Sequence, residues 1–576
     1  MLQRYLIIKI VNYLGYFYRN TPGYFDLLLR LKLVCREWYR EVVPKIIYGK
    51  EVLILNDKDF IKYQEVIDKN QLHFRIELNG ERSLENYKKY DNLRNNVYKY
   101  SIVTTDIIDI VYPSPILREI EYYPNYYNNP ENPKRILSDD VSKNLSVFIL
   151  NTSNWYQSNF QLYLSNYTTL FRKSENLNSF KIESNSDRAS PSVVKDLCSI
   201  TVFSELKSLI LCNTVLTSDD VNQTLLKLIK LEELSFNEIV FSQNQPQSGF
   251  ESIIENAIPN CHSLEYLNIL DFTEDSIIPI ESFVKCFNQT KTLKHVEITV
   301  FKVIFPEGVD KVYVENNTLE DISIAVDFEG IELRDIEDKI HFKGTSNLTH
   351  VIINFSQELS LQEVKDCHTQ CGSLELREMM SIHSSKLLDL KLPKLEILYI
   401  SCSYMFPHYI LANEALLNLY KFILLNNTLK ELDIKYSDFN IDAIVKILMI
   451  HKFSKITISA AYCSLEHLNH LVDTLCLPET QQLEYFVFSI NSKDREKKSE
   501  YIQLLTRLIT NNHTLKHIGW NAPQSNISQL PPLNDFEVAL KSNPSLHTLK
   551  VKLKDKTLRK VLDRYLLRKR KRSINY

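Results

Sequence analysis

Cysteine and histidine side chains, which can bind metals or act as nucleophile and base, lie close together at one place in the sequence, Cys367-His368 with Cys371. A structural zinc site needs four such ligands, and no second pair follows at a fitting distance. A thiol nucleophile needs a partner base, and no spacing pairs a particular cysteine with one, so the free cysteines are interpreted as buried apolar residues. We therefore expect no metal site and no catalytic residue.

Glycine-rich loops, which let backbone amides approach a phosphate, are absent from the sequence. The chain has 10 glycines in 576 residues, and the closest two, Gly15 and Gly23, are eight positions apart. No dinucleotide-binding, nucleophile-elbow or P-loop motif fits that spacing. We expect no cofactor, no small-molecule ligand and no enzymatic activity.

The overall composition indicates an ordered, soluble protein, with 44% hydrophobic and 24% charged residues. No apolar run approaches the roughly 18 residues of a membrane span. The ten cysteines are scattered from Cys35 to Cys476, and the first residues do not form a signal peptide. These features predict reduced thiols, no membrane partner and a cytoplasmic or nuclear location.

The secondary-structure elements that would position any functional side chain are predicted from a repeated sequence unit, LxxLxL. Fifteen copies run through the chain, and fourteen of them begin with leucine. At this apolar content one copy arises by chance about once in twelve residues, so the regular spacing carries the prediction. Because strand residues alternate between two faces, each copy predicts one strand. The copies begin at residues 117, 145, 177, 206, 231, 264, 293, 319, 348, 395, 429, 453, 483, 515 and 546.

The interval of 47 residues between Leu348 and Leu395 is longer than the others, which lie between 24 and 34. It holds either a degenerate repeat near Leu374 or an insertion. Several copies share an asparagine three residues before the leucine, and asparagine tolerates the left-handed conformation that ends a helix. We expect helix ends at these asparagines, which are Asn316, Asn426, Asn512 and Asn543.

Apolar residues at the helical spacing i, i+3, i+4 and i+7 lie between the strand units, for example within residues 441–448 and 501–509. The alternation of strand, loop and helix resembles the leucine-rich-repeat family in its longer, helix-containing form. The resemblance implies an α/β solenoid with parallel strands on a concave face and helices on a convex face. We divide the chain into residues 1–48, a linker and solenoid start at 49–116, repeats at 117–553, and a basic helix or tail at 554–576.

Side chains at the x positions of each strand unit should point out of the core toward the concave face. Aromatic and histidine side chains on an exposed sheet suit a protein contact. The alternative is that they are merely solvated. The residues predicted to bind a protein substrate are Tyr266, His295, His350, Tyr399, Tyr485 and His517, accompanied by Glu233, Asp321, Glu431 and Asp433.

The N-terminal segment, residues 1–48, carries two apolar helical patterns separated by a loop with Pro22 and Gly23. Its string of Leu31, Val34, Cys35 and Trp38 resembles the L..VC..W signature of the F-box family. That family binds the small acidic adaptor of cullin-based ubiquitin ligases. The resemblance implies adaptor contacts at Leu6, Ile10, Leu31, Val34, Cys35 and Trp38. A plain two-helix cap of the solenoid would show the same patterns.

Both ends of the chain are basic although the net charge is −3. Residues 1–50 carry nine basic and three acidic side chains, which suits an acidic adaptor. The tail sequence from Arg568 to Arg572 is interpreted in three ways: as a nuclear localisation signal, as a solvated last helical turn, or as a weak nucleic-acid patch.

Three functions follow from these patterns. The first is a substrate receptor of an SCF-type ubiquitin ligase, which docks through residues 1–48 and selects a protein on the concave face. The second is a leucine-rich-repeat interaction scaffold without a ubiquitin role, possibly nuclear. The third, GTPase activation, would need an exposed arginine, and the sequence marks no particular one.

Overall fold

A computed structural model describes much of the chain between Tyr48 and Asn575. The described residues are 48–54, 74–79, 97–104, 117–124, 143–152, 164–168, 174–183, 197–241, 249–271, 276–309, 312–328, 332–335, 340–342, 347–354, 371–377, 392–401, 413–437, 441–460, 464–480, 482–490, 498–521, 533–551 and 573–575.

The chain divides into two compact units. Unit 1 comprises Met1–Val312 and Ser323–Ile336, and unit 2 comprises Tyr313–Ile322 and Glu337–Tyr576. The boundary crosses two strands. Val312 of β15 (Val312–Val314) belongs to unit 1 and the rest of that strand to unit 2, whereas the first two residues of β16 (Asp321–Phe328) belong to unit 2 and the rest to unit 1.

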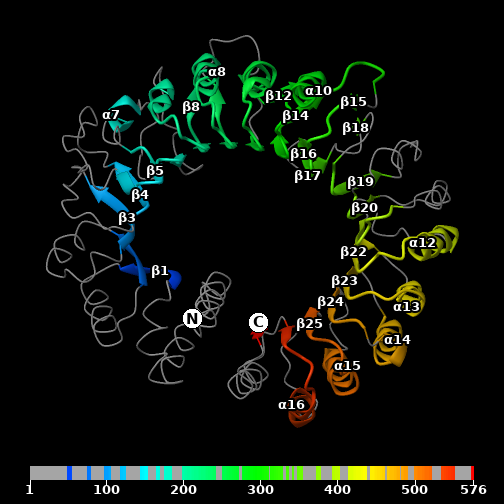
Figure 1. Cartoon of the computed structure of the whole chain (residues 1–576). Helices are drawn as coiled ribbons and strands as arrows, with labels where there is room; N and C mark the ends of the chain where they lie inside the picture. The colour runs from blue at the N-terminus through cyan, green and yellow to red at the C-terminus, as the bar shows by residue number, and fades with distance from the viewer. Residues whose placement is uncertain are drawn as a thin grey trace, which may run out of the picture. The chain divides into compact units, whose positions relative to one another are not determined.

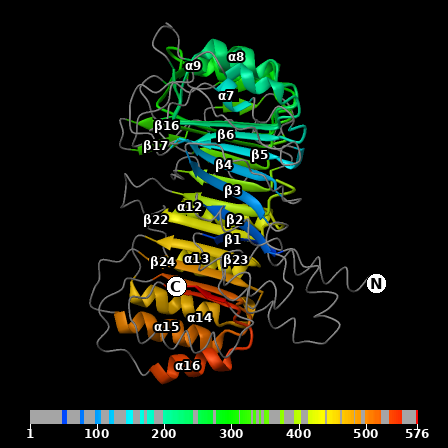
Figure 2. The ribbon, with the colours of Figure 1, turned by 90° about the vertical axis from the view of Figure 1, so that its left-hand side faces the viewer.

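Unit 1 is built on a sheet in which every described neighbouring pair is parallel up to β16, and β17 then adds antiparallel to β16. Figure 2 shows β3 to β6 stacked as successive rungs. The strands, in sheet order, are β1 (Tyr48–Ile54), β2 (Phe74–Asn79), β3 (Val97–Thr104), β4 (Glu119–Pro124), β5 (Val147–Asn151), β6 (Ser179–Glu183), β7 (Ser208–Cys212), β9 (Glu233–Asn237), β11 (Tyr266–Leu270), β13 (His295–Val300), β16 (Asp321–Phe328) and β17 (Glu332–Asp335).

Short helices and two-stranded pairs connect these strands on the outer side of unit 1 (Figure 1). The helical segments are α7 (Leu164–Thr168), η4 (Leu197–Val202), α8 (Ser218–Leu225), α9 (Gly249–Ser252), η5 (Ile253–Ala257), η6 (Ile258–Asn260) and α10 (Ile280–Gln289). The pairs are β8 (Val215–Leu216) with β10 (Val240–Phe241), and β12 (Ile277–Pro279) with β14 (Lys302–Ile304).

Unit 2 repeats the same plan with longer helices, which again lie on the outer side of its strands (Figure 1). Its sheet runs in the order β19 (His350–Asn354), β20 (Ser373–Arg377), β21 (Ile397–Ser401), β22 (Glu431–Ser437), β23 (Lys455–Ala460), β24 (Tyr485–Ile490), β25 (His517–Asn521), β26 (Thr548–Val551) and β27 (Ser573–Asn575). The helical segments are α12 (Asn413–Leu425), α13 (Ile441–Ile450), α14 (Leu465–Leu475), η9 (Pro478–Thr480), α15 (Lys498–Asn511) and α16 (Leu533–Ser542). A further pair joins β15 (Val312–Val314) to β18 (Ile340–Phe342).

The repeat pattern explains this architecture, because each of the fifteen predicted strand units coincides with a strand of one of the two sheets. The apolar residues of the units form the core: Leu432 and Ile434 of β22, for example, are each 1% exposed. The long interval holds a degenerate repeat, since β20 places a fully buried Leu374 in register with Val351 of β19. Regions 441–448 and 501–509 form helices α13 and α15, as predicted.

Helices end directly before Asn426, Asn512 and Asn543, as predicted, but Asn316 follows strand β15 and not a helix. The predicted reason for these asparagines was wrong. Among the described non-glycine residues only Asn213 and Glu238 have a positive φ, so the asparagines before the leucines are not left-handed. They act through their side chains instead. The Oδ1 atom of buried Asn512 accepts hydrogen bonds from the backbone N–H groups of Thr514, at 3.0 Å, and Leu515, at 2.9 Å.

The same asparagines also join successive repeats. Asn543 is fully buried, and its Nδ2 donates to the backbone oxygens of Ile509, at 2.8 Å, and Asn512, at 2.7 Å. Asn426 follows α12 and accepts the N–H of Leu392 at 3.0 Å. Each amide therefore satisfies backbone groups at the helix-to-strand turn that would otherwise be buried without partners. Within the described part of the chain, a helix that could span a membrane is not found.

Candidate binding surface on the open sheet face

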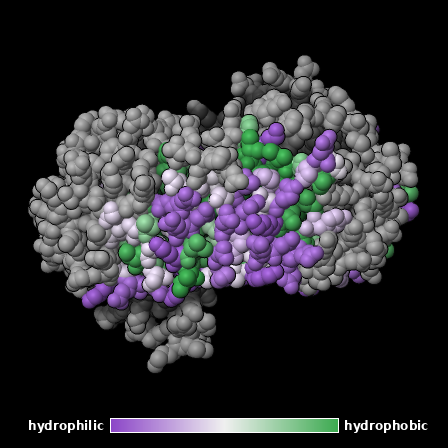
Figure 3. Space-filling view, turned by 90° about the horizontal axis from the view of Figure 1, so that it is seen from above, coloured by the Kyte–Doolittle hydropathy of each residue, from purple (hydrophilic) through white to green (hydrophobic). Residues whose placement is uncertain are grey.

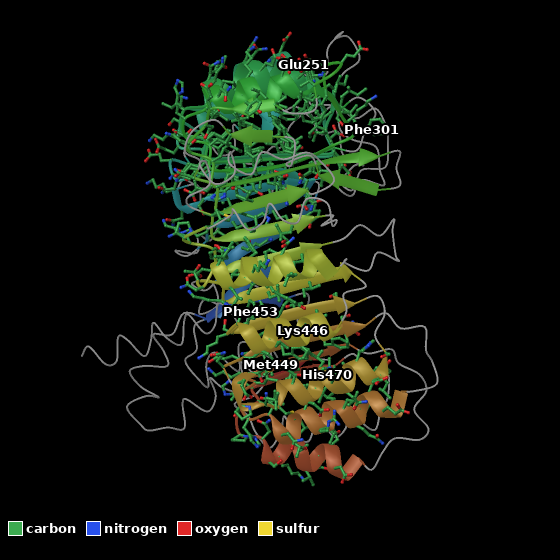
Figure 4. The ribbon with its side chains drawn as sticks, turned by 90° about the vertical axis from the view of Figure 1, so that its right-hand side faces the viewer. Glu251, Phe301, Lys446, Met449, Phe453 and His470 are labelled. Atoms are coloured by element: carbon green, nitrogen blue, oxygen red, sulfur yellow. The ribbon has the colours of Figure 1, made fainter. Side chains whose placement is uncertain are left out.

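The open face is defined here as the side of each main sheet opposite the connecting helices. Its residues are the x positions of the repeat, which alternate with core leucines and isoleucines along each strand. The outer side carries the helices; Lys446 and Met449 on α13 and His470 on α14 lie there (Figure 4). All six predicted substrate-contact residues lie on strands at x positions and are half-buried.

Two of the predicted residues meet on the first strands of unit 2. The rings of His350 on β19 and Tyr399 on β21 have centroids 5.9 Å apart in an edge-to-face arrangement. The intervening strand β20 contributes Ser373, whose Oγ lies 2.9 Å from Nδ1 of His350, and Glu375, whose Oε2 lies 3.9 Å from Nε2. The histidine is thus fixed against its neighbours.

Two further predicted residues meet on β24 and β25, where Tyr485 and His517 are direct cross-strand partners with ring centroids 5.5 Å apart. His547, which precedes β26, extends this group with a ring 6.2 Å from that of His517. Burial is the main cause that lowers the pKa of His517, and His547 and nearby lysines add to it. At neutral pH His517 is therefore an uncharged ring suited to packing and hydrogen bonding.

Charged side chains connect these two aromatic groups across β22 and β23. Lys455 bonds to Glu431 at 2.7 Å, and its ammonium group also lies 5.5 Å from the centre of the Tyr485 ring. Lys435 lies 5.5 Å from the centre of the Tyr399 ring. The open face of unit 2 is therefore a continuous surface of aromatic and charged groups from β19 to β25. At about 4.8 Å per strand it spans roughly 29 Å, enough for an extended peptide or one face of a helix.

The remaining two predicted residues lie in unit 1. Tyr266 on β11 and His295 on β13 are cross-strand partners with ring centroids 6.5 Å apart. The Tyr266 hydroxyl donates to Oε2 of Glu297 at 3.1 Å. The structure thus brings the six residues together as three pairs, one in unit 1 and two in unit 2.

A further group on the open face of unit 1 is centred on Glu121 of β4, a residue that the sequence patterns did not mark as a contact residue. Its carboxylate accepts hydrogen bonds from Tyr123, at 2.6 Å, Asn151, at 3.1 Å, and Ser101, at 3.2 Å, and forms an ion pair with Lys99 at 3.0 Å. Burial raises the pKa of Glu121, but the bonds from Tyr123, Lys99 and Asn151 outweigh it, and the pKa is lowered. Alternation within β4 predicts that Glu121 points outward. Its partners on β3 were missed because β3 lacks the leucine pattern.

The cysteines on described elements are buried or half-buried thiols. Burial raises the pKa of Cys371 to about 12, and its Sγ donates to the backbone oxygen of Ser373 at 3.1 Å. Burial likewise raises the pKa values of Cys261 and Cys286 to about 12. These groups are protonated and unreactive at neutral pH. Cys367 and His368 lie outside the described residues, and the described part of the chain contains no cluster of three metal-ligating side chains.

The predicted adaptor contacts, Leu6, Ile10, Leu31, Val34, Cys35 and Trp38, all fall within residues 1–47, which lie outside the described residues. The basic sequence from Arg568 to Arg572 also lies outside them.

Apolar side chains also reach the surface on the outer side of unit 1, where Val202, Leu226 and Ile229 are 52%, 52% and 69% exposed. Seen from above, the described surface is mostly hydrophilic and is crossed by narrow hydrophobic strips (Figure 3).

The parallel sheets, the strand-to-helix connections and the repeat register define a class: an α/β repeat protein with a leucine-rich-repeat-like solenoid fold. No family model matches the chain, and no curated protein matches it. A solved structure that matches is an internalin, inlF, from Listeria monocytogenes str. 4b F2365. The two share 12% identity over 74% of this chain and 92% of that chain, with a TM-score of 0.28. The assignment of the class rests on the repeat register of this chain.

Proposed function

We propose that this protein is a non-catalytic interaction scaffold that binds a protein partner on its open sheet face. The observation that carries the proposal is the surface from His350 to His517, where aromatic rings, ion pairs and cation–π contacts follow one another across seven strands. Rigid strands hold these side chains at fixed spacing, so that little side-chain entropy remains to be lost on binding. Tyrosine and histidine present apolar area together with hydrogen-bonding groups, as binding surfaces require.

The finer proposal is that the scaffold is the substrate receptor of an SCF-type ubiquitin ligase. Its support is the L..VC..W string of Leu31, Val34, Cys35 and Trp38 and the basic charge of residues 1–50. In this account residues 1–48 dock on the acidic adaptor subunit, and the open face selects the protein that other subunits modify. The chain itself transfers nothing.

A pull-down of the purified full-length chain with the purified adaptor tests the ligase role. Wild type should bind, whereas Val34→Asp and Trp38→Ala should lose binding because each removes an apolar contact of the motif. Ile229→Asp is the matched control, because Ile229 lies outside residues 1–48, its side chain is 69% exposed, and the change adds the same charge. The ligase role is contradicted when wild type fails to bind, or when Val34→Asp binds as well as wild type.

The alternative is a scaffold without a ubiquitin role, in which residues 1–48 only cap the array. It predicts that partner binding to the open face is unchanged by Val34→Asp and that no adaptor is recovered. The described contacts of the open face support both versions equally, since they concern only the partner-binding half of the proposal.

A further inference from the structure

One carboxylate oxygen at the centre of the open face of unit 2 is buried without a hydrogen-bond donor among the described residues. Asp433 lies in the middle of β22, between its cross-strand partners Tyr399 on β21 and Thr457 on β23. Its Oδ1 atom is enclosed and has no hydrogen-bond partner among the described residues. A carboxylate oxygen removed from water without a donor is a costly arrangement that a folded protein rarely keeps.

The two nearest ammonium groups do not supply the missing donor. Lys455 is bonded to Glu431 at 2.7 Å, and Lys435 lies over the Tyr399 ring at 5.5 Å. Burial raises the pKa of Asp433 above its ordinary value, and the charges of Lys435 and Lys455 offset this only in part. Glu375 and Glu431 add to the rise; Glu431 is paired with Lys455, and Glu375 is the cross-strand partner of Tyr399 on the same face.

This arrangement favours a cationic, planar donor. Glu431 neutralises Lys455, so the carboxylates of Asp433 and Glu375 lie beside the Tyr399 ring with the exposed Lys435 over that ring as their counter-charge, a position that another cation can take. A guanidinium group carries five donors, binds carboxylates through two parallel hydrogen bonds and stacks on aromatic rings. A neutral amide or hydroxyl would satisfy Oδ1 but would gain nothing from the neighbouring carboxylates.

We propose that Asp433 is the anchor for an arginine side chain of the protein partner that binds the open face of unit 2. The proposal rests on the proposed scaffold function and names the chemistry of its partner. In the complex the guanidinium group takes the place of the Lys435 ammonium group beside the Tyr399 ring and donates to the Asp433 carboxylate.

The probe is a displayed library of random linear peptides selected on the full-length chain. Each selected peptide is resynthesised with arginine and with citrulline, which has the same shape but no charge, and its affinity is measured for four proteins. These are wild type, Asp433→Asn, the open-face double variant Tyr399→Ala/Tyr485→Ala, and Asp535→Asn. Asp535 is exposed in the first turn of α16 and provides the matched control on the helical side.

The expected result is that selected peptides share an arginine and that Asp433→Asn weakens binding roughly tenfold or more, as loss of a charged hydrogen bond does. Citrulline should weaken binding to wild type by a similar factor and have little further effect on Asp433→Asn. Asp535→Asn should bind like wild type.

Three results would overturn the inference. Peptides that need Tyr399 and Tyr485 but bind Asp433→Asn and wild type equally would remove the anchor and leave the scaffold proposal standing. Peptides that bind the open face without a basic residue would do the same. Peptides that tolerate every open-face change, or a selection that returns no binder, would count against the scaffold proposal as well.

Discussion

The ammonium group of Lys455 lies 5.5 Å from the centre of the Tyr485 ring, and the two residues are direct partners on β23 and β24. The same ammonium group bonds to Glu431 on the preceding strand at 2.7 Å. One side chain thus links three strands on the open face. It holds the Tyr485 ring in place before any partner arrives, which is the arrangement expected of a binding surface that is rigid in its free state.

Replacement of Lys455 by methionine tests whether this linkage serves binding or stability. The pair is partly exposed, so the loss of the ion pair and the cation–π contact should lower the free energy of unfolding by less than about 1 kcal/mol. Partner affinity should fall more strongly. Urea denaturation and an affinity measurement on the same variant check this. A loss of stability with unchanged partner affinity would show that the contacts of Lys455 serve stability and not binding.

Asn426→Ala should destabilise the repeats around β21 and β22. The change leaves the N–H of Leu392 without its acceptor inside the protein, at a cost of about 1–3 kcal/mol. Because repeat proteins open locally, hydrogen–deuterium exchange should accelerate in these repeats first. Asn427→Ala is the matched control, since Asn427 is the exposed neighbour. Equal exchange in the two variants would refute the role assigned to the buried amide.

The Glu121 network should make the stability of unit 1 depend on pH. The folded-state pKa of Glu121 is lowered, so its contribution is present above its ordinary value and is lost as the pH falls through the lowered value. Glu121→Gln should therefore cost about 1–3 kcal/mol at pH 7 and much less at pH 3. Thermal unfolding of both proteins at the two pH values checks this, and a penalty that is independent of pH would contradict it.

Asp433 should behave in the opposite way. Its folded-state pKa is raised above the ordinary 3.8, so its contribution to stability is largest below that value and falls as the pH rises through the raised value. Asp433→Asn should make the free protein more stable than wild type at pH 7, with the gain vanishing at pH 3. A variant less stable than wild type at pH 7 would show that the carboxylate is already satisfied in the free protein.

The periodic part of this molecule is predictable from its sequence for a simple reason. The core leucines recur once per repeat, and each repeat consists of one strand and the segment that leads to the next strand. The fifteen units therefore reveal both the strands and the strand positions that point outward. His350 and Tyr485 lie where alternation places them. Strand β3 has Tyr100 as a core residue in place of leucine, so the leucine pattern does not predict it. The structure identifies it as part of the sheet because it pairs with β4.

Contacts between strands are less predictable, because they depend on register and on which neighbour each side chain reaches. The spacing between repeats does not predict, for example, that the cross-strand partner of Glu375 is Tyr399 and not Ile397. The role of Asn426 also differs from its propensity, since its amide bonds to buried backbone instead of adopting a left-handed conformation. Local preference was overridden by the need to satisfy buried polar groups.

The most direct test of the central claim is site-specific photocrosslinking from the two sides of unit 2. A photoreactive amino acid is placed at Thr457, on the open face of β23, or at Lys446, on the outer side of α13 (Figure 4). The account predicts that a bound partner is crosslinked from position 457 and not from position 446. Crosslinking from position 446 alone would contradict it, because the helical side rather than the open sheet face would then be the binding surface.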